Sequence, residues 1–459
     1  MNTSTHLSMN LDLAQFFQAC NPSKTLSFER LEDRKYYIDF AKVRGRDLIR
    51  ELSRTVMLSG ESPTCQLFTG HIGCGKSTEL LRLKAILEDN GFHTVYFESS
   101  QDMDLGNIDV SDILLAIARR VSASLETVGI RLRPRYFQSL FQEVSDFLST
   151  PIDLALEAEL SLGIGKLTTQ SRDNPRVRDR IRDYLEPRTN SILEAINQEL
   201  FAKAREELRH QGKKDLVVIV DNLDRIDNVE RSATERRQPA YLFVERGEKL
   251  RQLNCHVVYT IPMVLIFSND LSQVINRFGV DPKVLPMIPT KLPDGSTYQA
   301  GLDSLRQMVL TRAFPTLTTD GPSSPSDPIH LAQLAQVFDH ADTLTRLCTI
   351  SGGHVRNLLV LLRRCLEQAD PPITRACLES VIIQRSSEVN LAIQDHEWKL
   401  LCQVAQQRKD VRGEDEYQLL LESMFVLEYR HNGRLWFDIN PMLAETDEFQ
   451  ERCLGKPES

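Results

Sequence analysis

The chain has 459 residues, of which 41% are hydrophobic and 26% charged, an ordinary balance for a soluble globular protein of about two to four domains. The net charge of −9 gives no overall basic signature for nucleic acid, and no apolar run approaches the ~20 residues of a membrane span. Nine cysteines are scattered without a C-x-x-C pair, so we expect no zinc site and a reducing, cytoplasmic setting.

The first 40 residues are predicted to form an N-terminal arm. A short helix pattern at 11–17 precedes a charged stretch at 29–35. Gly45-Arg46 then opens an amphipathic helix, because apolar residues recur behind it at helical spacing. We expect this helix to begin an α/β core that extends over residues 41–314.

The most informative motif lies between Thr64 and Glu79. It fits the pattern G-x-x-x-x-G-K-[ST], with one extra glycine inside the loop; the residues concerned are Gly70, Gly73, Gly75, Lys76 and Ser77. Glycines let such a loop bend so that its N–H groups point inward at a phosphate chain. Lys76 is expected to reach the β- and γ-phosphates, and the Ser77 hydroxyl to bind Mg²⁺.

The context of this motif agrees with a phosphate-binding loop. Residues 65–69 are apolar enough for a buried strand, and apolar residues at helical spacing follow the loop until Asn90-Gly91. The positive end of that helix would also face the phosphates. The alternative, a chance match in a glycine-containing loop, is disfavoured by this strand–loop–helix order.

A second strand is predicted at 93–99, and residues 101–214 are predicted to form a mostly helical insertion. The next core strand is Leu216–Val220, whose five apolar residues indicate burial on both faces. It ends at Asp221, where a carboxylate helps to hold Mg²⁺ in P-loop NTPases. Asp224 is our candidate for the group that orients or deprotonates the attacking water. The alternative is a buried strand followed by an ordinary Asp-rich turn.

A helix at 239–253 leads to another predicted strand at 255–262. Thr260 lies near the carboxyl end of this strand, where a polar side chain can contact the γ-phosphate; alternatively it is simply a β-branched strand residue. Arg277 precedes the last predicted core strand, at 283–289.

The C-terminal third contains two further predicted domains. A Pro/Gly/Ser-rich linker at 315–328 leads to an all-helical segment at 329–388, in which a Gly-Gly turn launches a helix carrying Arg356. Arg356 is either a phosphate-sensing residue or a solvated helix arginine. Residues 389–450 show the order helix–helix–hairpin, with Asn432-Gly433 as the hairpin turn, which suggests a winged helix.

These motifs resemble those of AAA+ or STAND-type P-loop ATPases, and most closely the origin-recognition-type ATPases that end in a winged helix. The resemblance implies a sensor-1 role for Thr260, a sensor-2 role for Arg356 in a helical lid, and an arginine-finger role for Arg277. One departure concerns the base: many AAA+ proteins have Glu where this chain has Asn222. The ending Asp221-Asn-Leu-Asp-Arg225 is closer to the D-x-L-D-R of KAP-type ATPases.

We therefore expect an α/β protein with a P-loop NTPase parallel sheet, a helical insertion, a helical lid and a C-terminal winged-helix domain. ATP and Mg²⁺ are the expected cofactors. The expected catalytic residues are Lys76, Asp221, Asp224 and Arg277. The expected nucleotide-binding residues are Gly70, Gly73, Gly75, Lys76, Ser77, Thr78, Thr260 and Arg356, with Ser77 and Asp221 as the metal ligands.

The predicted function is a nucleotide-dependent switch in signalling or defence, with slow ATP hydrolysis, self-association and a protein partner. The alternatives are a nucleic-acid-binding initiator or loader that uses the winged helix, and a nucleotide-binding scaffold without turnover. Residues 395–459 contain eight Lys/Arg and fourteen Asp/Glu, a balance of −6 that disfavours DNA. No N/T-K-x-D element follows the Asp221 strand, which weakly favours ATP over GTP.

Overall fold

The computed structural model describes residues 10–148, 160–161, 164–165, 175–230, 236–315, 328–407, 415–431 and 433–455. Internal contacts divide the chain into two compact units. The sheet unit comprises Leu48–Gly70 and Glu79–Val284. The hairpin unit comprises Met1–Asp47, His71–Thr78 and Leu285–Ser459. The predicted phosphate loop thus belongs to the hairpin unit, whereas the strand before it belongs to the sheet unit.

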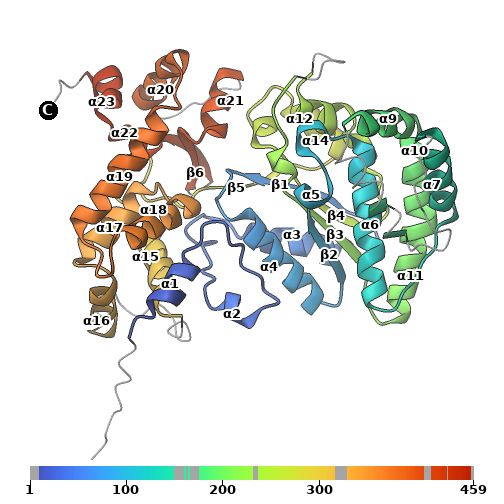
Figure 1. The fold of residues 1–459 in the computed structure, drawn as a ribbon, viewed down its shortest axis with the longest axis horizontal. Coiled ribbons are helices and arrows are strands. Elements are labelled where there is room, and N and C mark those ends of the chain that lie inside the picture. Colours follow the sequence, from blue (N-terminus) through green and yellow to red (C-terminus); the bar gives the residue numbers. More distant parts are fainter. Residues whose placement is uncertain are drawn as a thin grey trace, which may run out of the picture. The chain divides into compact units, whose positions relative to one another are not determined.

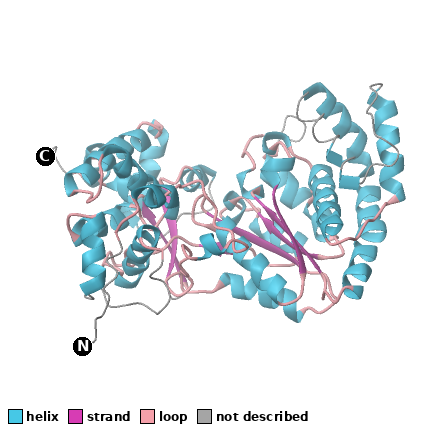
Figure 2. Cartoon of the chain, turned by 60° about the horizontal axis from the view of Figure 1, so that its bottom comes forward, coloured by secondary structure: helices cyan, strands magenta, loops and turns pink. Residues whose placement is uncertain are grey.

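A five-stranded sheet in the order β2-β3-β4-β1-β5 forms the centre of the sheet unit (Figure 2). The strands are β1 (Cys65–Gly70), β2 (His93–Glu98), β3 (Leu216–Asp221), β4 (His256–Thr260) and β5 (Lys283–Leu285). The pairs β2–β3, β3–β4 and β1–β4 are parallel. All six residues of β3 are buried, as expected for a strand covered on both faces. The predicted α/β fold with a parallel sheet is confirmed.

Parallel pairing brings the carboxyl ends of these strands to one edge of the sheet. Val220 pairs with Tyr259, and Phe68 pairs with Thr260. Gly70, Asp221 and Thr260 therefore end neighbouring strands at the same edge. This is the edge at which open parallel sheets bind ligands.

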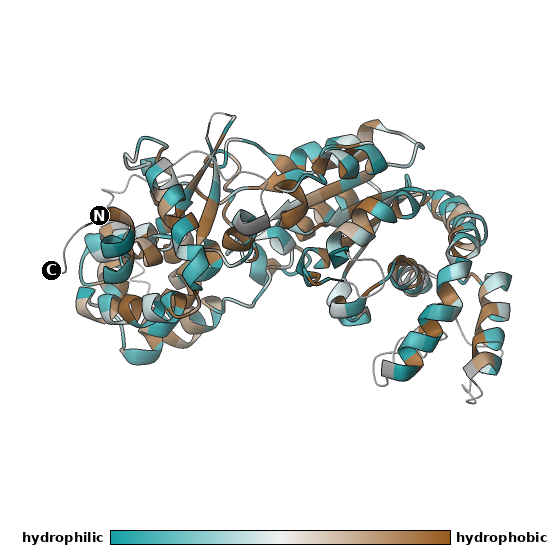
Figure 3. Cartoon of the chain, turned by 90° about the horizontal axis from the view of Figure 1, so that it is seen from above, coloured by the Kyte–Doolittle hydropathy of each residue, from teal (hydrophilic) through white to brown (hydrophobic). Residues whose placement is uncertain are grey.

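Helices from the predicted insertion pack beside the sheet (Figure 1). They are α5 (Ser99–Asp102), α6 (Val110–Thr127), α7 (Arg135–Leu148), α9 (Pro175–Leu185), α10 (Thr189–Ala195) and α11 (Ala202–His210), with a π-helical segment at Ile196–Phe201. Helix α6 contacts β2 and β3, and α10 contacts α6 and α7. Asp109 begins α6 with a capping box that it shares with Asp112. Figure 3 shows the apolar residues concentrated in the strands and on the inner faces of the helices.

The sheet unit contains further helices besides those of the insertion. They are α3 (Leu48–Leu58), α4 (Lys76–Asp89, which begins in the phosphate loop), α12 (Gln238–Ala240), α13 (Gly247–Arg251) and α14 (Leu271–Phe278). Two predictions need correction here. The helix expected at 239–253 is interrupted by a π-helical turn at Tyr241–Glu245. The strand expected at 283–289 ends at Leu285, because Pro286 and Pro289 cannot donate ladder hydrogen bonds.

The hairpin unit is built from helices and one two-stranded antiparallel hairpin, β6 (Val426–His431) and β7 (Arg434–Ile439). The helices are α1 (Leu13–Ala19), α2 (Leu31–Arg34), α15 (Gln299–Ala313), α16 (Pro328–Val337), α17 (Ala341–Ile350), α18 (Val355–Gln368), α19 (Arg375–Asn390), α20 (Asp395–Gln407), α21 (Asp415–Glu422), α22 (Pro441–Ala444) and α23 (Asp447–Leu454). The order α20, α21, β6, β7 contains the helices and hairpin expected of a winged helix, which remains a prediction. The predicted linker falls almost wholly outside the described residues.

The N-terminal arm is part of the core of this unit. Phe16 and Cys20, from α1 and its end, are fully buried in one apolar cluster with α15, α17 and α18. Ile38, Phe40 and Val43 belong to the same cluster. The arm therefore packs against α15, α17 and α18, which its sequence pattern did not predict.

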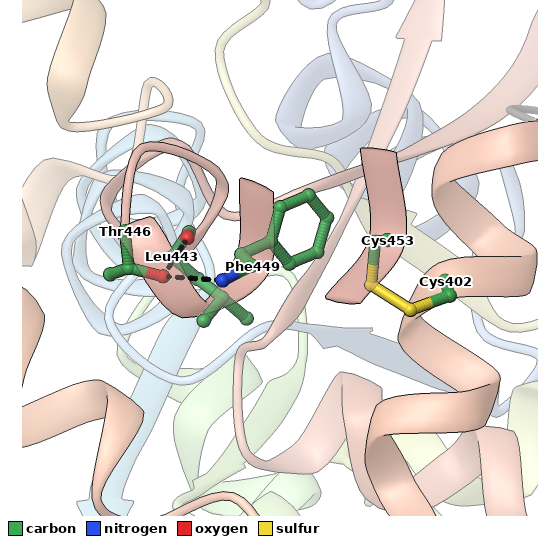
Figure 4. Close-up of a disulfide and its surroundings, with 5 residues drawn as sticks. All are labelled: Cys402, Leu443, Thr446, Phe449 and Cys453. Carbon is green, nitrogen blue, oxygen red and sulfur yellow. Dashed lines mark hydrogen bonds between the residues drawn. A yellow bond between two sulfur atoms is a disulfide. The ribbon is translucent and has the colours of Figure 1, made fainter. Parts of the chain in front are cut away.

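Two cysteines are joined in a disulfide, contrary to the expectation of a fully reduced set. Cys402 of α20 and Cys453 of α23 are bonded, with their Cα atoms 4.6 Å apart (Figure 4). This separation is normal for a disulfide. The other seven cysteines are free thiols. None of the described helices combines the length and the apolar character needed to cross a membrane.

Candidate nucleotide site

The predicted phosphate loop connects β1 to α4 and has the backbone that its glycines permit. Gly73 and Gly75 have φ angles of +88° and +105°, which side chains other than glycine's rarely tolerate. A Cβ atom at Gly75 would meet nothing within 4 Å, so the loop is open on that side, where a phosphate group fits. Gly70 ends β1, and Ser77 and Thr78 lie half-buried in the first turn of α4. These features fit a phosphate chain.

Lys76, the first residue of α4, is almost fully buried. Its Nζ atom donates a hydrogen bond of 2.8 Å to the backbone oxygen of His71 in the same loop. The ammonium is thus held at the loop by one of its three donors.

The next three loop carbonyls also accept hydrogen bonds from the hairpin unit. The oxygen of Ile72 lies 2.8 Å from Nε2 of His354, which must carry the proton because a carbonyl only accepts. The oxygen of Gly73 accepts from the backbone N–H of Arg356 at 3.2 Å. The oxygen of Cys74 accepts from Nη2 of Arg44 at 2.6 Å.

Glycine at 73 makes the approach of the 351–356 turn possible. A Cβ atom there would lie 2.6 Å from His354 Nε2 and 2.8 Å from Arg356 Cβ, both closer than real contacts allow. Within the hairpin unit, the predicted site residue Arg356 therefore lies directly beside the phosphate loop. Gly353 is equally constrained, because its Cβ would lie 1.7 Å from the oxygen of Ile288.

The C-terminal hairpin also contacts the loop. The backbone N–H of Glu428 in β6 donates to Nε2 of His71 at 3.0 Å. The Glu428 side chain is fully buried and accepts from Nε of Arg430 at 2.9 Å, and burial raises its pKa despite this partner. Tyr429 donates from its hydroxyl to the oxygen of Gly352 at 2.7 Å. The hairpin, the 351–356 turn and the phosphate loop thus form one hydrogen-bonded network.

Both histidines of this network are neutral at physiological pH. Burial, followed by repulsion from His354 and Lys76, lowers the pKa of His71 from 6.5 to about 3. Burial is also the main reason that the pKa of His354 falls to about 4. Neutral rings suit their contacts, because His71 must accept at Nε2 and cannot do so when doubly protonated.

We expect the hairpin unit to lose stability in acid because of these histidines. Between pH 6.5 and about 4 the unfolded chain binds protons that folded His71 and His354 do not, so the unfolding free energy falls as pH falls. The slope is up to about 1.4 kcal/mol per pH unit for each histidine. Urea unfolding measured by tryptophan fluorescence reports on this unit, because it contains both tryptophans, Trp398 and Trp436. In His354→Gln the slope should be shallower than in the wild type; an equal slope would contradict the prediction.

The second group of predicted site residues lies at the strand ends of the sheet unit. Asp221 is fully buried at the end of β3, where its Oδ2 accepts from the Tyr96 hydroxyl at 2.8 Å. Its Oδ1 accepts from the backbone N–H of Asn222 at 2.7 Å. These two bonds fix the orientation of the Asp221 carboxylate at the end of the strand.

Thr260 and Asn222 shape the turn that carries Asp224. Asn222 has a φ of +65°, a conformation that asparagine tolerates better than most residues, and it sends the chain into a 3₁₀ turn at Leu223–Arg225. Thr260 is fully buried, and its Oγ1 accepts from the backbone N–H of Leu223 at 2.9 Å. In this structure the Thr260 hydroxyl therefore positions the turn, and the half-buried Asp224 lies at its centre.

Arg277 lies in the sheet unit near the end of α14, with about half of its side chain exposed. Its Nε donates to the oxygen of Val244 at 3.1 Å, and its Nη1 lies 3.8 Å from Glu248. These partners come from distant sequence positions, so the residues next to Arg277 did not reveal them.

Sequence reasoning missed five residues that contact the loop or the metal-ligand candidate: Arg44, His71, His354, Glu428 and Tyr96. His71 and Arg44 lie within or beside recognised motifs, but no pattern marks a residue that binds a loop carbonyl. Glu428 and Tyr96 lie in ordinary strands. Their contacts depend on tertiary packing alone.

No family model matches this sequence, and no curated protein matches it either. Among solved structures, the chain is similar to the Aeropyrum pernix ORC2 protein in its ADPNP-ADP complexes, with 12% identity, coverage of 96% of this chain and 98% of that one, and a TM-score of 0.41. A Walker-type ATPase of Pyrococcus abyssi gives 12% identity, coverage of 93% and 98%, and a TM-score of 0.42. The Aeropyrum pernix ORC1 protein in complex with DNA gives 16% identity, coverage of 88% and 92%, and a TM-score of 0.35.

These TM-scores are below 0.5, so the fold is assigned from the chain's own features. The parallel sheet, the glycine loop after β1 and the helix that begins at Lys76 are the elements that define this assignment. Together they give the chain a P-loop NTPase fold.

Proposed function

We propose that the chain binds Mg-ATP at loop 70–78 and hydrolyses it slowly, as a nucleotide-dependent switch in signalling or defence. The observation that carries the proposal is the loop itself: two glycines at positive φ precede a helix that begins with a buried lysine. Glycine amides and a lysine ammonium in this order are the groups that bind a phosphate chain.

The proposed roles follow from the chemistry of each side chain. Lys76 neutralises charge on the β- and γ-phosphates, while Ser77 and Asp221 are the metal ligands. Mg²⁺ supplies charge neutralisation when it is bound. Asp224 accepts a proton from the attacking water or orients it, and the Thr260 hydroxyl fixes the turn that carries Asp224.

A protein partner suits the C-terminal residues better than DNA does. The balance of −6 over residues 395–459 repels phosphates at long range. At the hairpin, Arg430 is bound to the buried Glu428 carboxylate and is therefore partly neutralised. The switch is thus our proposed function, and DNA-stimulated turnover would argue for an initiator or loader instead.

Asp224→Asn should bind Mg-ATP as the wild type does but hydrolyse it about 10²–10⁴-fold more slowly, because the amide cannot accept the proton. Asp221→Asn should instead weaken the Mg²⁺-dependent part of binding. Single-turnover hydrolysis and equilibrium nucleotide binding, measured on the same preparations, separate the two effects.

Asp227→Asn is the matched control, because Asp227 is an exposed acid three residues further along the same loop. It should turn over ATP at the wild-type rate. If Asp224→Asn is as active as this control, Asp224 is not the base. If the wild type neither binds nor hydrolyses ATP, the proposed function itself is wrong.

A further inference from the structure

The outward hydrogen bonds of the phosphate loop determine where its amides point. A trans peptide is planar, so the N–H of one residue points opposite to the carbonyl of the residue before it. Ile72 and Cys74 present their carbonyls to His354 and Arg44. The N–H groups that follow, of the two loop glycines 73 and 75, are therefore directed away from these anchors.

The carbonyl of His71 instead closes the loop on itself. The oxygen of His71 accepts from the backbone N–H of Cys74 at 3.2 Å as well as from Lys76. The Cys74 amide is thus used within the loop, and the amides of Gly73 and Gly75 are the ones that the side-chain anchors orient. Gly75 faces open space, as a phosphate-binding position requires.

We propose that Arg44 and His354 are positioning residues, which hold the carbonyls of the phosphate loop from outside and so aim the Gly73 and Gly75 amides at the nucleotide's phosphates. The inference rests on the proposed function, since it assumes that the loop binds a nucleotide. Neither side chain is required to touch the nucleotide itself. Their effect on affinity comes from preorganisation, because an amide that is already aimed does not have to be ordered on binding.

The burial of both anchors supports this role. Arg44 is 4% exposed and His354 is fully buried, and Nη2 of Arg44 and Nε2 of His354 each have a loop carbonyl as partner. The Arg44 guanidinium also lies 5.5 Å from the centre of the Phe40 ring, which fixes its direction. His354 precedes α18, and Gly73 leaves room for its ring. Rigid surroundings are what a positioning residue needs to orient a loop.

The test uses two substitutions that remove the donor and preserve the bulk, His354→Phe and Arg44→Met. His354→Gln is the rescue variant, because the glutamine amide can donate where Nε2 does. We expect each donor-deleted variant to bind Mg-ATP about 5- to 50-fold more weakly than the wild type. Affinity for adenosine, which lacks phosphates, should not change. His354→Gln should recover most of the Mg-ATP affinity.

Two further measurements separate positioning from a general loss of structure. The same substitutions at exposed positions of the hairpin unit, His396→Phe and Arg434→Met, serve as matched controls and should bind Mg-ATP normally. Hydrogen exchange of peptides covering residues 71–78, measured without nucleotide, should be faster in the donor-deleted variants than in the wild type and should slow again in His354→Gln.

Two results would overturn the inference: wild-type Mg-ATP affinity in both donor-deleted variants, or an equal loss of adenosine and Mg-ATP affinity. If the wild type binds no nucleotide, the proposed function fails and the role in binding fails with it. Hydrogen exchange would then still show whether Arg44 and His354 order the loop, so the two failures are distinguishable.

Discussion

Lys76→Ala should lower the affinity for Mg-ATP by about 100-fold or more while leaving the fold intact. The ammonium is the one side-chain cation within the proposed glycine loop, and charge-assisted hydrogen bonds to phosphate are among the strongest that a protein makes. The fold should survive because the His71 carbonyl, which loses its bond to Lys76, still accepts from Cys74. Removing a buried charge also removes its desolvation cost.

Isothermal titration calorimetry with Mg-ATP gives the affinity, and circular dichroism with thermal unfolding checks the fold. Lys84→Ala is the control on the same helix, where Lys84 forms an i,i+4 pair with Glu88 at 2.7 Å. This control should bind normally, since such pairs have only local effects. Wild-type affinity in a folded Lys76→Ala protein would exclude loop 70–78 as the phosphate site.

The sheet could be predicted from the sequence because its strands are short apolar runs that end in recognisable residues. The runs before Gly70 and Asp221 were placed almost to the residue. The predicted strand at 283–289 is longer than β5, which ends at Leu285. Apolar residues continue past Pro286, where the proline cannot donate a hydrogen bond to the neighbouring strand. The burial of Phe16 and Cys20 among α15, α17 and α18 could not be predicted, since long-range packing leaves no local periodicity.

Residues of the candidate site can be predicted where chemistry fixes residue type and spacing, but not where tertiary contacts decide. Gly73, Gly75 and Lys76 follow from the needs of a phosphate chain. The anchors Arg44 and His354 do not, because any buried donor could satisfy a loop carbonyl. Thr260 illustrates the difference: its position at a strand end was predictable, but its bond to the Leu223 amide is visible only in the structure.

Arg277→Ala should abolish a stimulation of hydrolysis that depends on self-association, with ATP binding retained. An arginine that enters a neighbouring subunit's site neutralises charge developing on the γ-phosphoryl group and raises the rate by about 10³–10⁵-fold. Its pairing with Glu248 does not prevent such a role. The pair is 3.8 Å long and half-exposed at both ends, and surface pairs of this kind contribute less than about 1 kcal/mol. The alternative is that Arg277 only ends α14, where a cation suits the helix dipole and the Val244 carbonyl supplies its partner.

Specific ATPase activity measured against protein concentration distinguishes these roles. In the wild type, activity per subunit should rise cooperatively as the chain self-associates, and in Arg277→Ala it should stay at the low-concentration level. Arg251→Ala is the control, because Arg251 is an exposed arginine that donates to the Arg277 backbone oxygen at 3.4 Å.

Mixing Arg277→Ala with Asp224→Asn tests directly whether the arginine acts between subunits. Each subunit then lacks a different group, and only an arginine that acts between subunits allows the mixture to recover activity that neither variant has alone. Flat activity per subunit in the wild type, or a fully active Arg277→Ala, would show that Arg277 has no part in the reaction of a neighbouring subunit.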